Sequence, residues 1–231
     1  MPQRDLDIYK LSDNATLVAA VRVRARETQP IAETAPTRPI NPYGSSKLMT
    51  EMMLRHTAAA HGLGYVALRY FNVAGADPGG RAGERRPMAT HLINVATQVA
   101  LGKRPLIEIF GEDYDTPDGT CIRDYIHVSD LADAHLKAVE HLERGGESLT
   151  LNCGYGRGAS VREVLAEVEA VAGRKLAIQA APRRPGDPPR LVAEAERIRA
   201  LLGWQPRHDN LAAIIKSALD WEKRHREFAN Q

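Results

Sequence analysis

The chain has 231 residues, of which 43% are hydrophobic and 26% are charged, a composition typical of a globular protein of one or two domains rather than of a disordered tail. Its 31 basic and 29 acidic residues give a formal net charge of +2, so no strong field indicates binding to nucleic acid or to a membrane surface. No apolar run reaches the roughly 18 to 20 residues of a membrane span, and no apolar signal core opens the chain, so we expect a cytoplasmic protein.

The first part of the chain has the least regular pattern. Residues 1–28 carry no recognisable motif. A Val/Arg alternation over residues 18–26 could form an exposed strand, and it leads into a proline-containing loop over residues 28–39. We therefore expect residues 1–28 to be an atypical segment.

Farther along, short apolar or β-branched runs alternate with longer helical patterns, which is typical of βαβ units and an α/β sheet. Asn41-Pro42 offers an N-cap and a proline suited to the first helical position, so we predict a helix over residues 43–60. Ser129 is expected to cap a later helix, and Ser160 with Glu163 has capping-box spacing. The other predicted elements are strands at 65–71, 106–110, 125–128, 148–152 and 176–179, helices at 91–101, 130–142, 160–172, 194–202 and 211–228, and a proline-rich loop at 181–190.

Tyr43 and Lys47 are four residues apart and therefore lie on one face of the predicted helix. A positive charge near a phenol favours the phenolate, so Tyr43 could act as a general base and remove a proton from a sugar hydroxyl. The same spacing is common on solvated helix faces, so the pair gains weight only from its context.

That context is a family resemblance. The segment NPYGSSK at 41–47 resembles the active-site helix of extended short-chain dehydrogenases. The segments LRYFNVAGA at 68–76, IFGEDY at 109–114 and DGTCIRDYIHVSDLADAH at 118–135 resemble UDP-glucose 4-epimerases in order and spacing, and the last is the most specific. The resemblance runs from about Glu33 to the C-terminus.

The resemblance implies an α/β fold with two parts. The first is a partial Rossmann-like, doubly wound sheet that lacks its first strands and its Gly-rich turn, and the second is a smaller α/β substrate-binding domain. Residues 29–75 would be the C-terminal remnant of the NAD-binding domain with its catalytic helix. Residues 76–231 would be mainly the nucleotide-sugar-binding domain, with about 121–145 returning to the Rossmann sheet.

The resemblance also implies a function. Family members hold NAD and invert C4 of a UDP-hexose through a transient 4-keto sugar, which interconverts UDP-glucose and UDP-galactose in galactose metabolism. A homodimer through the helix at 43–60, with Met49, Met52 and Met53, is also expected from the family. No nucleic acid or membrane partner is expected.

Site residues follow position by position from the resemblance. Tyr43 would be the base, and Lys47 would favour its phenolate and hydrogen-bond the nicotinamide ribose. Tyr70 and Phe71 would lie against the nicotinamide and the sugar, although ordinary core packing is equally expected of both. The remaining substrate-binding assignments are Asn72, Arg123 and Arg184 to the diphosphate, Leu92 and Phe110 to the uracil region, Asp187 to the ribose hydroxyls and Leu191 to the hexose. Paired guanidinium hydrogen bonds suit phosphate oxygens, and a leucine at 191 leaves open whether N-acetylated sugars fit.

One glycine-rich segment matches a dinucleotide-binding turn. The run GYGRGA at 154–159 has the G-x-G-x-x-A form, but the following strand at 176–179 carries no acidic residue for a ribose. We interpret it as a tight turn before a helix. No such turn occurs before Tyr43, and residues 21–27 lack the Ser/Thr-rich strand end of the family. We therefore expect this chain alone to be inactive, and unstable or prone to aggregate because its sheet would have an uncovered edge.

Other interpretations stay open. The same fold could serve another NAD-dependent nucleotide-sugar epimerase, a dehydratase or a decarboxylase, and the chain could instead be a non-catalytic remnant that binds a UDP-sugar or a partner subunit. The two cysteines, Cys121 and Cys153, lack the spacing of a zinc site or a disulfide framework and are expected to be small buried residues. No metal is expected, because loop acids are usually solvated, although a remote candidate set is Asp115, Asp118, Asp124, His127 and Asp133.

Overall fold

The computed structural model describes residues 14–18, 29–39, 42–86 and 89–228. Apart from Val18, which ends the first strand, the strand predicted over 18–26 lies outside the described residues. Among the described helices, none combines the length and the apolar character that a membrane crossing requires.

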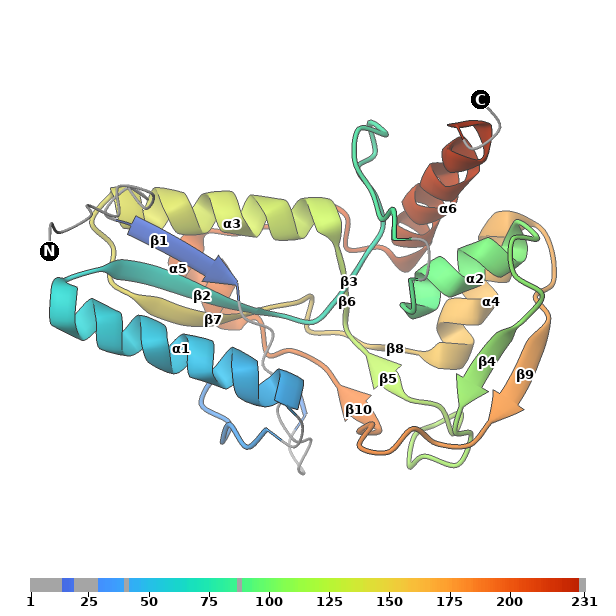
Figure 1. The fold of residues 1–231 in the computed structure, drawn as a ribbon, viewed down its shortest axis with the longest axis horizontal. Helices are drawn as coiled ribbons and strands as arrows, with labels where there is room; N and C mark the ends of the chain where they lie inside the picture. Colours follow the sequence, from blue (N-terminus) through green and yellow to red (C-terminus); the bar gives the residue numbers. More distant parts are fainter. Residues whose placement is uncertain (1–13, 19–28, 40–41, 87–88, 229–231) are drawn as a thin grey trace, which may run out of the picture.

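The larger part of the molecule, which we call the sheet lobe, is a parallel sheet with helices on both faces. Its strands are β1 (Asn14–Val18), β2 (Gly64–Tyr70) and β7 (Leu149–Cys153), in the order β1-β2-β7. Helix α1 (Pro42–His61) runs along one face and α3 (Val128–Glu143) along the other (Figure 1). Helices on both faces explain why β2 is buried along nearly its whole length, as strands of parallel sheets usually are.

Helix α5 (Glu196–Leu202) completes the sheet lobe by packing against β7 and α3. Its capping residue Gly203 has a positive φ of 63° and precedes Trp204, which is fully buried. The Trp204 indole donates a hydrogen bond to the backbone oxygen of Asp130, 3.0 Å away. This bond joins the segment after α5 to the first turn of α3.

The second part, which we call the smaller lobe, lies at the opposite end of the molecule (Figure 1). Strands β4 (Ile107–Phe110) and β9 (Ile178–Ala181) pair in parallel. Helices α2 (Leu92–Ala100), α4 (Val161–Ala172) and α6 (Leu211–Phe228) all contact one another. The fold is thus α/β with a Rossmann-like sheet and a smaller α/β lobe, as the sequence predicts.

Very short strands join the two lobes. Strand β3 (Asn72–Ala74) pairs in parallel with β6 (Tyr125–His127). Strand β5 (Ile122–Arg123) lies between β10 (Arg190–Leu191) and β8 (Ala159–Ser160). The sequence analysis did not identify β5, β8 or β10 as strands, because two residues are too few to show a periodic pattern.

The helix caps confirm one prediction and correct another. The capping box of α4 is present, with the Ser160 hydroxyl accepting from the Glu163 amide and the Glu163 carboxylate accepting from the Ser160 amide. Ser129 is not the cap of α3, so that prediction was wrong. The cap is His127, whose Nδ1 accepts from the Ser129 amide at 3.0 Å. A histidine nitrogen thus takes the role that residue statistics assign to a serine hydroxyl.

Candidate functional site

A cleft of about 950 Å³ lies where the first turn of α1, the ends of β2 and β3, and the start of α2 meet. The carboxyl ends of parallel strands are the usual place for ligands in α/β sheets. Of the predicted site residues, those that line this cleft are Tyr43, Tyr70, Phe71, Asn72, Leu92 and Leu191. The structure therefore brings side chains from five elements, α1, β2, β3, α2 and β10, into one space.

The Tyr43 and Lys47 side chains lie together on α1. The Lys47 ammonium is 5.4 Å from the centroid of the Tyr43 ring, and the Tyr43 side chain is half exposed at the cleft. Tyr70 lies near enough for the two phenols to interact electrostatically: burial, and then the charge that Tyr43 would carry, raise the pKa of Tyr70. Tyr70 therefore stays protonated and keeps a hydroxyl proton to donate in the cleft.

A buried ion pair fixes α1 on the sheet. The Arg69 Nε and Nη2 donate to the Glu51 carboxylate oxygens at 2.8 and 2.7 Å, and both residues are buried. Within α1, only Gly44 and Glu51 are fully buried. Because the helix has few other buried contacts, this ion pair sets the position of Tyr43 relative to β2.

The segment before α1 is also held in place. Ile31 pairs with Ala193 in a parallel bridge, and its backbone oxygen accepts from the Asn152 amide nitrogen at 2.7 Å. The Glu33 carboxylate accepts from the Asn152 backbone amide at 2.9 Å, and the Glu33 backbone oxygen accepts from Arg69 at 3.0 Å. The described residues of the loop predicted over 28–39 are thus packed against β2, β7 and the segment that contains Ala193.

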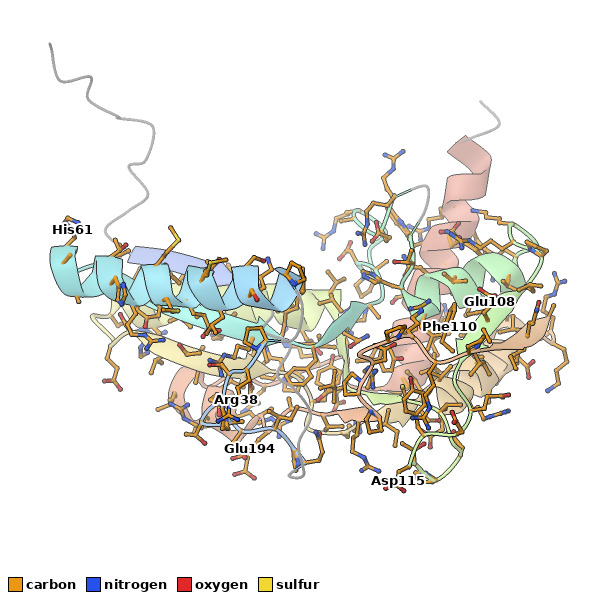
Figure 2. All side chains as sticks on the ribbon, turned by 60° about the horizontal axis from the view of Figure 1, so that its bottom comes forward. Arg38, His61, Glu108, Phe110, Asp115 and Glu194 are labelled. Atoms are coloured by element: carbon orange, nitrogen blue, oxygen red, sulfur yellow. The ribbon has the colours of Figure 1, made fainter. Side chains whose placement is uncertain are left out.

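The other predicted site residues form a second group. The Arg184 guanidinium lies 3.7 Å from the centroid of the Phe110 ring, and the Arg123 Nη2 lies 3.6 Å from an oxygen of Asp187. Phe110 is on the side of the smaller lobe that faces the sheet lobe (Figure 2). These four side chains do not line the cleft described above, and each contacts another member of the group. They join the cleft through the backbone, because the Asn72 amide donates to the oxygen of the residue after Arg123 at 2.9 Å.

Several polar residues line the cleft that sequence reasoning did not assign. Arg86 pairs with Glu84 at 2.6 Å and lies 3.4 Å from the Nδ1 of His91. Burial, and then the Arg86 charge, lower the pKa of His91. His135, also at the cleft, has its Nδ1 2.7 Å from the Leu131 oxygen, so Nδ1 carries a proton and donates it to that oxygen. No spacing rule could have found Arg86 or His91, because Arg86 lies in the loop before α2, His91 is the N-cap residue of that helix, and neither belongs to a motif identified in the sequence.

The glycine run at 154–159 forms the turn between β7 and α4, and its amides bind a protein carboxylate. Asp124, which is fully buried, accepts from the Tyr155 and Gly156 amides, each at 3.0 Å. A side chain thus occupies the position that a phosphate would take in a dinucleotide-binding turn. The described residues contain no cluster of His, Cys, Asp or Glu that could hold a metal, and Asp115 lies at the far end of the loop after β4 (Figure 2). Cys121 and Cys153 are buried free thiols, as predicted.

Comparison with known proteins agrees with this arrangement. The family model described as NAD dependent epimerase/dehydratase family matches residues 19–154. The chain belongs to this family. The match begins inside the segment 1–28, for which the sequence analysis found no resemblance.

Within this family, relatives of the chain are UDP-glucose 4-epimerases. The protein from Azospirillum brasilense is 67% identical over 199 residues, which are 86% of this chain and 57% of that protein. The one from Halalkalibacterium halodurans is 50% identical over 85% of this chain and 59% of its own length. This chain therefore spans about three fifths of the length of these relatives.

Solved structures of the family have the same fold. The UDP-glucose 4-epimerase from Brucella ovis in complex with NAD has a TM-score of 0.86 and 45% identity, over 90% of this chain and 64% of that one. The enzyme from Bifidobacterium longum in complex with NAD+ and UDP has a TM-score of 0.86 and 36% identity, over 92% of this chain and 64% of that one. The fold and the family resemblance predicted from the sequence are thereby confirmed, and NAD is the cofactor of the family.

Proposed function

We propose that this chain carries the catalytic and substrate-binding residues of a UDP-glucose 4-epimerase, which interconverts UDP-glucose and UDP-galactose through a transient 4-keto sugar. The observation that supports this most is the Tyr43 phenol at the cleft, with the Lys47 ammonium 5.4 Å from its ring and with Asn72 and Leu191 lining the same space. A base, its activating cation and substrate-binding side chains then share one site.

The proposed proton transfer uses Tyr43. Its oxygen accepts the proton of the sugar 4-hydroxyl, and Lys47 stabilises the phenolate by its positive charge. NAD, when bound, supplies the acceptor for the hydride from the sugar carbon. In this proposal Tyr43, Lys47 and Tyr70 would bind the nicotinamide and its ribose. The sequence has no glycine before Gly44, so residues 1–43 cannot form a glycine-rich turn for the cofactor pyrophosphate.

The second group of residues has the chemistry of a nucleoside diphosphate site. Phe110 offers a ring face for uracil, and Arg123 and Arg184 offer guanidinium groups for the diphosphate. Asp187 offers a carboxylate for ribose hydroxyls. Leu191 is buried at the cleft and would set the room for the hexose. UDP binding would replace the Arg184–Phe110 and Arg123–Asp187 contacts with contacts to the ligand.

Finer points of the proposal rest on the family and on surface exposure. We propose a homodimer through α1, because Met49, Met52 and Met53 on this helix are 55%, 44% and 68% exposed. A place in galactose metabolism and in the cytoplasm stays a prediction. Two alternatives differ in chemistry: another NAD-dependent nucleotide-sugar epimerase or dehydratase, and a UDP-sugar-binding protein without catalysis.

A Tyr43→Phe substitution tests the proposal. It is made in a fusion that places the N-terminal part of the Azospirillum brasilense relative ahead of residues 29–231. Turnover of UDP-galactose should fall by a factor of about 10² to 10⁴, while UDP affinity stays the same, because only the proton acceptor is lost. The control is Tyr65→Phe, since Tyr65 is a buried β2 residue that does not line the cleft. Near-normal turnover of the Tyr43→Phe fusion would refute the role of Tyr43, and UDP binding without any turnover in the unsubstituted fusion would favour the non-catalytic alternative.

A further inference from the structure

Asp124 lies between β5 and β6 and has no exposed surface. Its carboxylate accepts hydrogen bonds from three backbone amides, those of Tyr155 at 3.0 Å, Gly156 at 3.0 Å and Ala193 at 3.2 Å. Burial raises the pKa of this carboxyl, and the three amides oppose that effect. A buried charge of this kind is tolerated because amide donors surround it, as in the backbone nests that bind anions.

The turn around the Asp124 carboxylate is tightly packed. A Cβ added at Gly154 would lie 2.8 Å from an Asp124 carboxylate oxygen and 2.8 Å from the Ala193 Cβ. Gly156 has a φ of 79°, which side-chain-bearing residues rarely adopt. Glycines at these positions let the backbone amides reach the carboxylate directly.

The backbone of Asp124 bonds to two strands that carry proposed substrate contacts. The Asp124 amide donates to the Leu191 oxygen on β10 at 3.0 Å, and its oxygen accepts from the Asn72 amide on β3 at 2.9 Å. Its chain neighbours are Arg123, which pairs with Asp187, and Tyr125, which lines the cleft. One residue thus connects the segments that carry Asn72, Arg123, Tyr125 and Leu191.

We propose that Asp124 is a positioning residue for the nucleotide sugar. By binding the 155–156 turn and the Ala193 amide, its carboxylate holds Leu191 and Asn72 at a fixed distance from Arg123, so that hexose and diphosphate are bound together. This inference rests on the function proposed above. An uncharged side chain cannot do the same, because an asparagine at this place would turn its NH₂ group toward at least one of the three amide donors.

The first experiment needs no ligand and uses the chain itself. Amide hydrogen exchange is followed by NMR in Asp124→Asn, and rates are normalised to the amide of Leu68 in β2. Exchange at Asn72 should accelerate by about tenfold or more, although the Asn72 amide bonds to the Asp124 backbone and not to the altered side chain. The control is Asp118→Asn, since Asp118 also accepts from a backbone amide, that of Thr120 at 2.8 Å, but does not bond to β3 or β10. Unchanged Asn72 exchange in Asp124→Asn overturns the proposal.

The second experiment compares ligands by calorimetry. UDP-glucose affinity should fall by about tenfold or more in Asp124→Asn while uridine affinity changes little, because only the hexose and diphosphate contacts are displaced. Equal losses for both ligands, or no loss, would mean that Asp124 supports the fold alone and would overturn the positioning role. Failure of the unsubstituted chain to bind either ligand would count against the proposed function of this chain, while the exchange experiment would still decide the role of Asp124.

A second variant covers the case in which Asp124→Asn does not fold. Gly154→Ala keeps the charge but pushes a methyl group against the Asp124 carboxylate and Ala193. Like Asp124→Asn, it should accelerate amide exchange at Asn72 and lower the affinity for UDP-glucose relative to the affinity for uridine. The control is Gly173→Ala, which strains the backbone because Gly173 has a φ of 68°, but which adds no contact because a Cβ there meets nothing within 4 Å. Identical behaviour of Gly154→Ala and Gly173→Ala would refute the proposal.

Discussion

The ion pair between Glu51 and Arg69 should dominate the attachment of α1 to the sheet. Glu51→Gln keeps the size of the side chain and one oxygen acceptor, but it removes the negative charge. Arg69 would then remain buried, with 10% of its side chain exposed, and without a counter-charge. Besides the one oxygen acceptor that the substituted side chain keeps, Arg69 would still donate to the Glu33 backbone oxygen at 3.0 Å.

The size of the effect follows from these contacts. Removal of one partner of a buried ion pair typically costs about 3 to 5 kcal/mol, because the other charge stays desolvated. Glu51→Gln retains one of the two bonds to Arg69, so we expect the lower end, about 3 kcal/mol. Total stabilities of native domains are about 5 to 15 kcal/mol, so this single change would remove a large share.

Pulse proteolysis over a urea series measures the free energy of unfolding with little protein, which suits a chain expected to aggregate. The control is Glu140→Gln, which removes the charge that pairs with Lys137 and Arg144 on α3. Because 43% of the Glu140 side chain is exposed, its loss should change the free energy of unfolding far less than Glu51→Gln does. If the two variants differed by less than about 1 kcal/mol, the view that the buried pair anchors α1 would be wrong.

Two further predictions concern Gly75 and His127, the first about packing and the second about pH. Gly75 has a φ of 81°, and a Cβ there would lie 2.7 Å from His127 and 2.9 Å from Ser217, so Gly75→Ala should lower the free energy of unfolding by about 2 kcal/mol or more in a urea titration. Gly62→Ala should cost less, because Gly62 also has a positive φ but a Cβ there meets nothing within 4 Å. Burial, and then the nearby His208, lower the pKa of His127 from 6.5 to about 4. As the pH falls, the imidazole of His127 therefore takes up a proton in the unfolded chain at a higher pH than in the folded chain. The free energy of unfolding should decrease as the pH falls from 6.5 to about 4. His127→Gln should weaken that pH dependence, and an unchanged slope would contradict the assignment.

The sequence was most informative where a local rule decides the structure. The Asn41-Pro42 pair marked the start of a helix predicted over residues 43–60, and the structure has α1 at Pro42–His61. Ser160 and Glu163 form their capping box because both partners lie within one turn. The two-residue strands were missed because β5 pairs with β10 and β8, which are far away in sequence, and these pairings leave no pattern along the chain.

The site residues, too, could be predicted where a local pattern marks them and not where distant segments meet. Tyr43 and Asn72 could be placed at one cleft because motifs and strand ends mark them. The contact of Arg184 with Phe110 could not be predicted, because the two residues are more than seventy positions apart and are brought together by the pairing of β4 with β9, which leaves no pattern along the chain. The role of Asp124 could not be predicted either, because it depends on hydrogen bonds from three backbone amides in two other segments.

The path of the chain between the lobes limits how this protein can move. The backbone passes between the two lobes at residues 71–74, 124–127, 154–158, 192–195 and 203–210. A hinge at a single linker would allow the lobes to open and close freely. Here several backbone segments connect the lobes, and all of them must bend at once. Large closure around a ligand is therefore disfavoured, and under the proposed function the hexose would bind between nearly rigid walls.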